Sequence, residues 1–155
     1  MSSAATDLSR KRVEFLIHST WPTLATEADA WLRNAPEVGL ADPPGDLRIT
    51  PVTVNTHDGL VAGFSWFASY SDPAELVEAH DELCGLIARL LGVPGILEHE
   101  GGHSGYWVTS KFAVETYAHG ASERKGGRSI ESTLQVNVAD SMLAASQEAI
   151  ARGSL

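Results

Sequence analysis

Two segments of the sequence alternate between apolar and polar residues with a period of two, and this pattern constrains the fold most. The residues that share one face of the segment 60–70 are Leu60, Ala62, Phe64, Trp66, Ala68 and Tyr70. In the segment 130–138, Ile130, Ser132, Leu134, Val136 and Val138 alternate with Glu131, Thr133, Gln135 and Asn137. Successive strand residues point to opposite faces. Each segment therefore predicts a strand, and the second predicts a sheet with one buried and one solvent-facing side.

Two further segments have strand-like composition. Residues 47–56 are rich in Ile, Val and Thr, and Pro51 within them indicates an edge position or a bulge. The turn signal His57-Asp58-Gly59 joins this run to the strand at 60–70, so we expect a hairpin. Residues 105–119 are interpreted as one long strand, with Tyr106, Val108, Phe112, Val114 and Ala118 on its buried side.

The best-marked helix lies between Asp72 and Gly92. Asp72 can cap it, Pro73 fits its first turn, and Glu75 completes an arrangement similar to a capping box. A second helix is predicted to start near Thr20-Trp21-Pro22 and to end at Pro36, and a last one to run from Asp140 to Gly153. Residues 1–9 are expected to be a disordered tail, and residues 10–18 fit either a helix or an edge strand.

This order of elements predicts one α+β domain over residues 1–155. Hairpins separated by helices favour an antiparallel sheet of four to five strands, with the helices packed mainly on one face. The length is typical of one domain, and 43% hydrophobic residues are enough for a buried core.

The charge and the cysteine content narrow the function classes. The formal net charge is −9, which argues against binding to nucleic acid and favours a basic protein partner. Cys84 is the only cysteine, so no internal disulfide can form. The sequence shows no signal peptide and no run of about 20 apolar residues. We therefore expect a cytoplasmic protein that does not bind membranes.

The segment His99-Glu100-Gly101-Gly102-His103 fits the spacing of zinc proteases, in which two histidines lie one helical turn apart. Two glycines within a helix cost about 2 kcal/mol relative to alanine, so a strand, a Gly-Gly turn and a second strand is the better interpretation. With a two-residue turn, Glu100 faces His103 and His99 faces Ser104, so the two imidazoles diverge. We expect neither a metal nor another cofactor. If a metal is held, His99, His103 and His119 are the candidate ligands.

The candidate catalytic residues are His103 and Glu100, although no pattern in the sequence names a reaction. His80 lies on the apolar stripe of the helix after Asp72, where a histidine is more often part of the core than a ligand. Cys84 is interpreted as a small buried hydrophobic residue rather than a reactive thiol.

Two groups of residues are candidates for partner binding. Trp107 and Tyr117 fall on the more polar row of the predicted strand at 105–119, and we group them with Trp66 as a candidate aromatic contact surface. The acidic residues in the first half of the well-marked helix form the second group, which consists of Glu75, Glu78, Asp81 and Glu82.

The strand that begins Gly105-Tyr106-Trp107-Val108 and the later Leu134-Gln135-Val136-Asn137-Val138 strand, in a small acidic α+β domain, resemble immunity proteins of bacterial secreted-toxin systems. The resemblance covers about residues 47–140 and implies a protein that binds and blocks a toxin. It identifies no functional residue. The chain also resembles small acidic secretion chaperones, which usually dimerise.

Three functions remain open from the sequence. The first is a protein-binding module, an immunity or inhibitor protein that blocks a basic partner. The second is a small enzyme or ligand-binding domain with a pocket around His99, Glu100, His103 and His119. The third is a dimeric protein similar to secretion chaperones, and the chain is accordingly expected to be a monomer or a homodimer.

Overall fold

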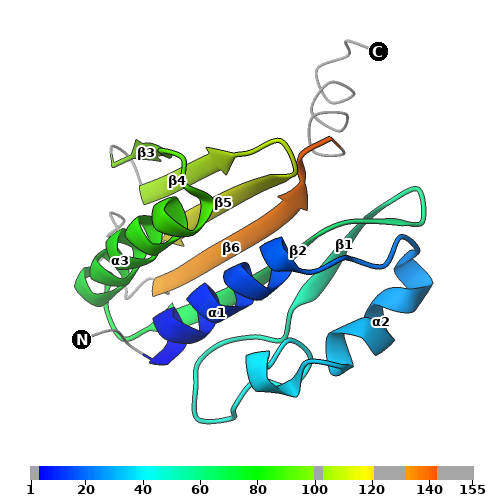
Figure 1. Cartoon of the computed structure of the whole chain (residues 1–155). Helices are drawn as coiled ribbons and strands as arrows, with labels where there is room; N and C mark the ends of the chain where they lie inside the picture. Colours follow the sequence, from blue (N-terminus) through cyan, green and yellow to red (C-terminus); the bar gives the residue numbers. More distant parts are fainter. Residues whose placement is uncertain (1–3, 100–102, 121–131, 143–155) are drawn as a thin grey trace.

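The computed structural model describes residues 4–99, 103–120 and 132–142. Figure 1 shows a twisted sheet with helices on one side. The helices are α1 (Ala4–His18), α2 (Ala25–Arg33) and α3 (Pro73–Leu91), with a short 3-10 turn at Pro36–Val38. The strands are β1 (Thr53–His57), β2 (Leu60–Tyr70), β3 (Ile96–Glu98), β4 (His103–Val108), β5 (Phe112–His119) and β6 (Ser132–Asp140).

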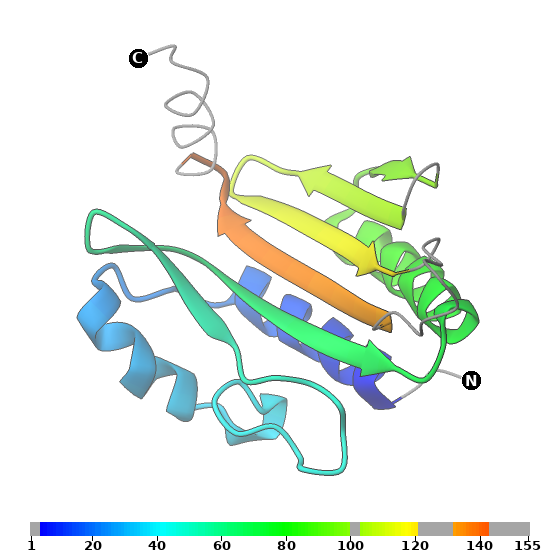
Figure 2. The same cartoon turned by 180° about the vertical axis from the view of Figure 1, so that it is seen from behind.

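The strands form one six-stranded sheet in the order β1-β2-β6-β5-β4-β3, and all neighbouring pairs are antiparallel. Helices α1 and α3 lie side by side across one face, and the view from behind shows that no described helix covers the middle of the other (Figures 1 and 2). The predicted α+β class is therefore confirmed. No described helix is long and apolar enough to cross a lipid bilayer.

The sheet has more strands than predicted because residues 105–119 form two strands instead of one. The chain reverses at Thr109, whose backbone N–H donates to Phe112 O over 2.8 Å. The Thr109 hydroxyl accepts from Phe112 N at 3.0 Å. A threonine side chain thus holds a turn that contains neither glycine nor proline, and for this reason the turn was not recognised from the sequence.

Helix α1 resolves the open question at residues 10–18 and corrects the prediction of a disordered tail for residues 4–9, while residues 1–3 lie outside the described residues. The helix begins at Ala4, and Thr6 and Ser9 are fully buried. Trp66 Nε1 donates to Ser9 Oγ at 3.1 Å, and the hydroxyls of Thr6 and Tyr70 are 3.1 Å apart. Polar residues are mixed with Leu8, Val13 and Leu16 on its buried side, so α1 lacks the continuous apolar stripe that usually reveals a packed helix.

Arg12 is a second reason why α1 resembles a surface segment in sequence. Its guanidinium is fully buried and donates to the carbonyl oxygens of Gly39 and Thr50. It also lies 5.4 Å from the centre of the Trp66 ring. Burial lowers the pKa of Arg12 to about 10. The contacts tie the segment that follows α2 to the first helix.

Helix α3 agrees with its prediction. Asp72 Oδ1 accepts a hydrogen bond from Glu75 N at 2.8 Å, and Gly92 ends the helix with a φ of 69°. Helix α2 is shorter than predicted, because Leu24 still pairs with Leu60 as an isolated bridge before the helix begins. Of the predicted last helix, Ser141 and Met142 are helical, and the remainder lies outside the described residues, as do residues 130–131.

The core lies between the two helices and the sheet face that they cover. It includes Val13, Leu16, Leu76, Leu83 and Ile87 from the helices, and Phe64, Trp66, Val114, Leu134, Val136 and Val138 from the strands. The even-numbered residues of β5 and β6, and those of β2 from Phe64 to Tyr70, point into this core, whereas at the start of β2 Val61 is in the core and Ala62 lines the opposite face. The odd-numbered neighbours of these core-facing even-numbered residues therefore form the uncovered face.

Candidate functional site

Two of the three predicted contact aromatics belong to the core. Trp66 is 0% exposed and Trp107 is 1% exposed, so neither side chain can touch a partner in this fold. Trp107 pairs with Val114 on the covered face, because the turn between β4 and β5 changes which residues face the helices. A Cβ on Gly95 would lie 2.3 Å from Trp107 Nε1, and one on Gly105 would also collide with the ring. These two glycines make room for the indole. Their presence near Trp107 is the feature of the sequence from which its burial could have been predicted.

The third aromatic, Tyr117, lies on the uncovered face of the sheet. This face is hollowed over a volume of about 940 Å³. We call it the open hollow, and its lining includes Glu98, Tyr106, Glu115, Tyr117, Gln135 and Asn137. Among the described residues that line it, none is Lys, Arg or His, while two are carboxylates. Ile96 and Val108 add exposed apolar surface at the β3–β4 side.

Hydrogen bonds between side chains order the polar part of the open hollow. The Tyr117 hydroxyl donates to Glu115 Oε2, and this hydrogen bond, with burial and the nearby carboxylate charge, raises the pKa of Tyr117 to about 12. Gln135 Nε2 donates to Asn137 Oδ1 at 3.1 Å, and Gln135 Oε1 lies 2.8 Å from His119 Nε2. The polar side chains are thus held in place before any ligand binds.

His119 belongs to this row and not to a group with His99 and His103. Its ring stacks on Tyr117 at a centroid distance of 6.1 Å, on the far side of the sheet from the helices. The predicted set of three metal-ligand candidates is therefore not brought together. His99 and His103, however, do meet at the edge of the covered face.

The prediction that these two imidazoles diverge is wrong. The rings of His99 and His103 are 5.1 Å apart between centroids. Ile96 pairs with Tyr106 and Glu98 pairs with Ser104. Continued by one residue, this register sets His99 opposite His103, whereas a two-residue turn would have set it opposite Ser104. A shift of one residue reverses the face of every side chain, and it brings the two histidines onto the same face. Glu100, the second catalytic candidate, lies outside the described residues.

His80 of α3 adjoins this pair from the core. It is 0% exposed, its Nε2 lies 2.9 Å from Thr116 Oγ1, and its ring centre is 6.2 Å from that of His103. Burial lowers the pKa of His80 to about 4, so the imidazole is neutral at pH 7. Cys84 Sγ lies 3.5 Å from His80 Nε2, and burial raises the pKa of this thiol to about 11. Cys84 thus has the buried, unreactive character expected from the sequence.

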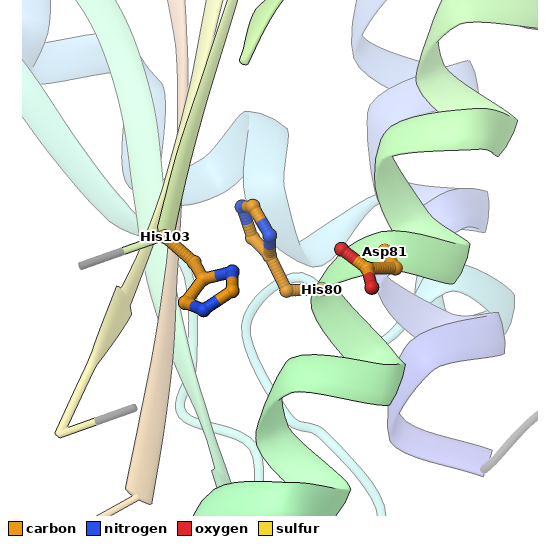
Figure 3. A group of neighbouring side chains, drawn as sticks. All are labelled: His80, Asp81 and His103. Carbon is orange, nitrogen blue, oxygen red and sulfur yellow. The ribbon is translucent and has the colours of Figure 1, made fainter. Parts of the chain in front are cut away.

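The histidines and Asp81 form a compact group, which we call the histidine cluster: His80, Asp81, His99 and His103. One ligand atom each from His80, Asp81 and His103 lies within 4.8 Å of the other two. Figure 3 shows His103 projecting from the sheet toward His80 and Asp81 on α3. His99 Nε2 is 3.8 Å from Asp81 Oδ1. His103 Nδ1 is buried, and it has no hydrogen-bond partner within the described part of the chain.

The predicted acidic surface of α3 is present but separate from the open hollow. Glu75, Glu78 and Asp81 are exposed, and Glu82 is half-buried. Helix α3 covers the opposite face of the sheet (Figure 1), so its carboxylates and those of the hollow cannot contact one partner segment together. Asp81 also belongs to the histidine cluster. Glu75 and Glu78 are therefore the exposed carboxylates that belong only to the acidic surface of α3.

The protein-family models, the curated proteins and the solved structures compared with this chain yield no match.

Proposed function

We propose that this protein is a protein-binding module of the inhibitor or immunity type, and that the open hollow receives a basic segment of its partner. The observation that carries the proposal is the composition of the hollow. It combines the carboxylates of Glu98 and Glu115 with two tyrosines, on a sheet face that no described helix covers.

The charges of the hollow favour a cationic partner. Glu98 is exposed and Glu115 is half-buried, so an approaching Lys or Arg side chain can pair with either carboxylate without full desolvation. The net charge of −9 accelerates the approach of a basic protein through long-range attraction. The same charge disfavours acidic partners and nucleic acids.

The aromatic and apolar lining supplies contact area. Tyr106 is 37% exposed, and Ile96 and Val108 are 66% and 46% exposed on the same side of the sheet. Tyrosine is enriched among the residues that dominate binding energy, since it offers a large rigid surface and a hydroxyl. The hydrogen bond between Tyr117 and Glu115 orders both side chains in advance, which lowers the entropy cost of binding.

The proposal is tested with a fluorescently labelled arginine-rich peptide and fluorescence anisotropy at low and moderate salt. The double variant Glu98→Gln/Glu115→Gln removes two charges from the hollow, and Glu75→Gln/Glu78→Gln removes two from the surface of α3. The first is expected to weaken binding about tenfold, which corresponds to about 1.4 kcal/mol from two exposed ion pairs. The second serves as the matched control.

Equal losses in the two double variants would mean that the peptide responds only to net charge. Unchanged binding in the hollow variant would exclude the open hollow as the site. Either result contradicts the proposal, whereas a loss confined to the hollow variant supports it.

The histidine cluster favours a second candidate function, a ligand-binding or enzymatic domain. Its support is the convergence of His99 and His103 on His80, which the sequence alone did not predict. The pocket differs from the predicted one because His119 lies across the sheet from it. The chemistry of this cluster is independent of partner binding at the open hollow.

A further inference from the structure

We infer that His80, Asp81 and His103 bind a divalent transition-metal ion, Zn²⁺, between helix α3 and the end of strand β4. The three side chains offer two imidazole nitrogens and one carboxylate oxygen, all within 4.8 Å of one another. Two histidines and one carboxylate form a ligand set found in catalytic zinc sites, where the fourth position is left for water or a substrate. The inference does not depend on the proposed partner binding.

The simplest alternative is that His80 is an ordinary core residue. Its hydrogen bond to Thr116 and its contact with Cys84 would be enough to explain its own burial. They do not explain His103, whose buried Nδ1 is left without a partner by every described residue although it faces α3. Buried polar atoms of native proteins are generally satisfied, and a metal ion would satisfy this nitrogen.

His80 is oriented as metal-binding histidines usually are. In the tautomer that the metal site requires, Nε2 donates its proton to Thr116 Oγ1 over 2.9 Å and Nδ1 keeps its lone pair, with Cys84 Sγ 3.7 Å away as a weak neighbour. A hydrogen bond of this kind fixes the ring and raises the basicity of the ligating nitrogen. His99 is farther from Asp81, with Nε2 3.8 Å from Oδ1 on the solvent side, which is beyond hydrogen-bond distance.

The distances require a modest closure of the group. In a tetrahedral zinc site with bonds of about 2.0–2.1 Å, neighbouring ligand atoms are about 3.3 Å apart. His80 is fixed in the core, while Asp81 is exposed and His103 is half-buried. The last two side chains can therefore rotate inward, and an ion can enter from the side of Asp81 and His99 without unfolding the core.

The experiment is a zinc titration of the metal-free protein, with stoichiometry and affinity measured by calorimetry and thermal stability measured with and without zinc. Co²⁺ in place of Zn²⁺ reports the coordination geometry through its visible absorption. The test variants are Asp81→Asn and His103→Gln, because both side chains lie outside the fully buried core and can be changed with the fold intact. His57→Gln, at the β1–β2 turn, is the control for histidine loss elsewhere.

We expect one zinc ion per chain and a rise in the melting temperature on its addition. Either test variant should lower the zinc affinity by about tenfold to hundredfold and reduce the rise in melting temperature at a given zinc concentration, while His57→Gln should change neither. No binding at about 1 mM zinc overturns the site. So does binding that Asp81→Asn and His103→Gln leave unchanged, and binding of Co²⁺ but not Zn²⁺ overturns the assignment of the metal.

Discussion

Replacing Thr116 with valine is expected to lower the free energy of unfolding of the metal-free protein by about 1–2 kcal/mol. Valine keeps the shape of threonine but removes the hydroxyl that lies 2.9 Å from His80 Nε2. Since His80 and Thr116 are both 0% exposed, water cannot replace the lost bond. A buried donor left without a partner costs about 1–3 kcal/mol.

The expected loss lies toward the lower end of that range because Cys84 Sγ, 3.5 Å from His80 Nε2, remains as a weak partner. Urea unfolding followed by circular dichroism measures the effect. With a slope of about 2 kcal/mol per molar, the midpoint should fall by about 0.5–1 M. Thr116→Ser keeps the hydroxyl and loses only a methyl group, so it separates the hydrogen bond from packing.

The zinc affinity of the same two variants provides an independent readout. Thr116→Val should weaken zinc binding by about tenfold or more, because the ring of His80 loses the hydrogen bond that orients it, and Thr116→Ser should retain most of the affinity. A Thr116→Val protein as stable as the original, or one less affected than Thr116→Ser, would refute the hydrogen bond between His80 and Thr116.

Three further predictions concern the sheet, helix α3 and the open hollow. Gly63→Ala should destabilise the fold by about 3 kcal/mol, because its Cβ would lie 2.4 Å from Val138 O, a backbone atom of β6 that cannot easily move. Gly85→Ala should raise the free energy of unfolding by about 0.5–1 kcal/mol, because Gly85 lies on the exposed side of α3 and no atom is within 4 Å of the added Cβ. Urea unfolding of both glycine variants measures these changes in stability. Tyr117 should ionise near pH 12, and Glu115→Gln should lower its pKa toward the ordinary value of about 10, because the neutral phenol loses its hydrogen bond to the carboxylate and the phenolate loses a negative neighbour. Absorbance titration against a Tyr117→Phe variant measures this, and an ionisation of Tyr117 near pH 10 in the original protein would contradict it.

The elements that were predicted correctly from the sequence are those whose residue pattern lies within the element itself. The period-two pattern of β2 and the cap at Asp72 each lie within one element, and both were found. The elements that were missed depend on contacts between distant segments. Helix α1 uses Thr6, Ser9 and Arg12 to bond with residues far along the chain, so polar residues interrupt the apolar residues on its buried side.

The histidine cluster was missed for a similar reason. Its formation depends on the one-residue difference in register between β3 and β4, which moves His99 to the face of His103. It also depends on α3 packing over β4 and β5, which brings His80 to Thr116. Neither the register of a short hairpin nor the packing of a helix on a sheet is encoded in the spacing of the five residues that matched a zinc-protease pattern.

The location of partner binding is the central claim, and amide chemical-shift mapping of the isotope-labelled protein with the arginine-rich peptide tests it most directly. We expect the largest shifts on the uncovered strands, at Tyr106, Tyr117 and Asn137, with little change along α3. Shifts concentrated on α3 around Glu75 and Glu78, with the strand residues unchanged, would contradict the assignment of the open hollow as the binding surface.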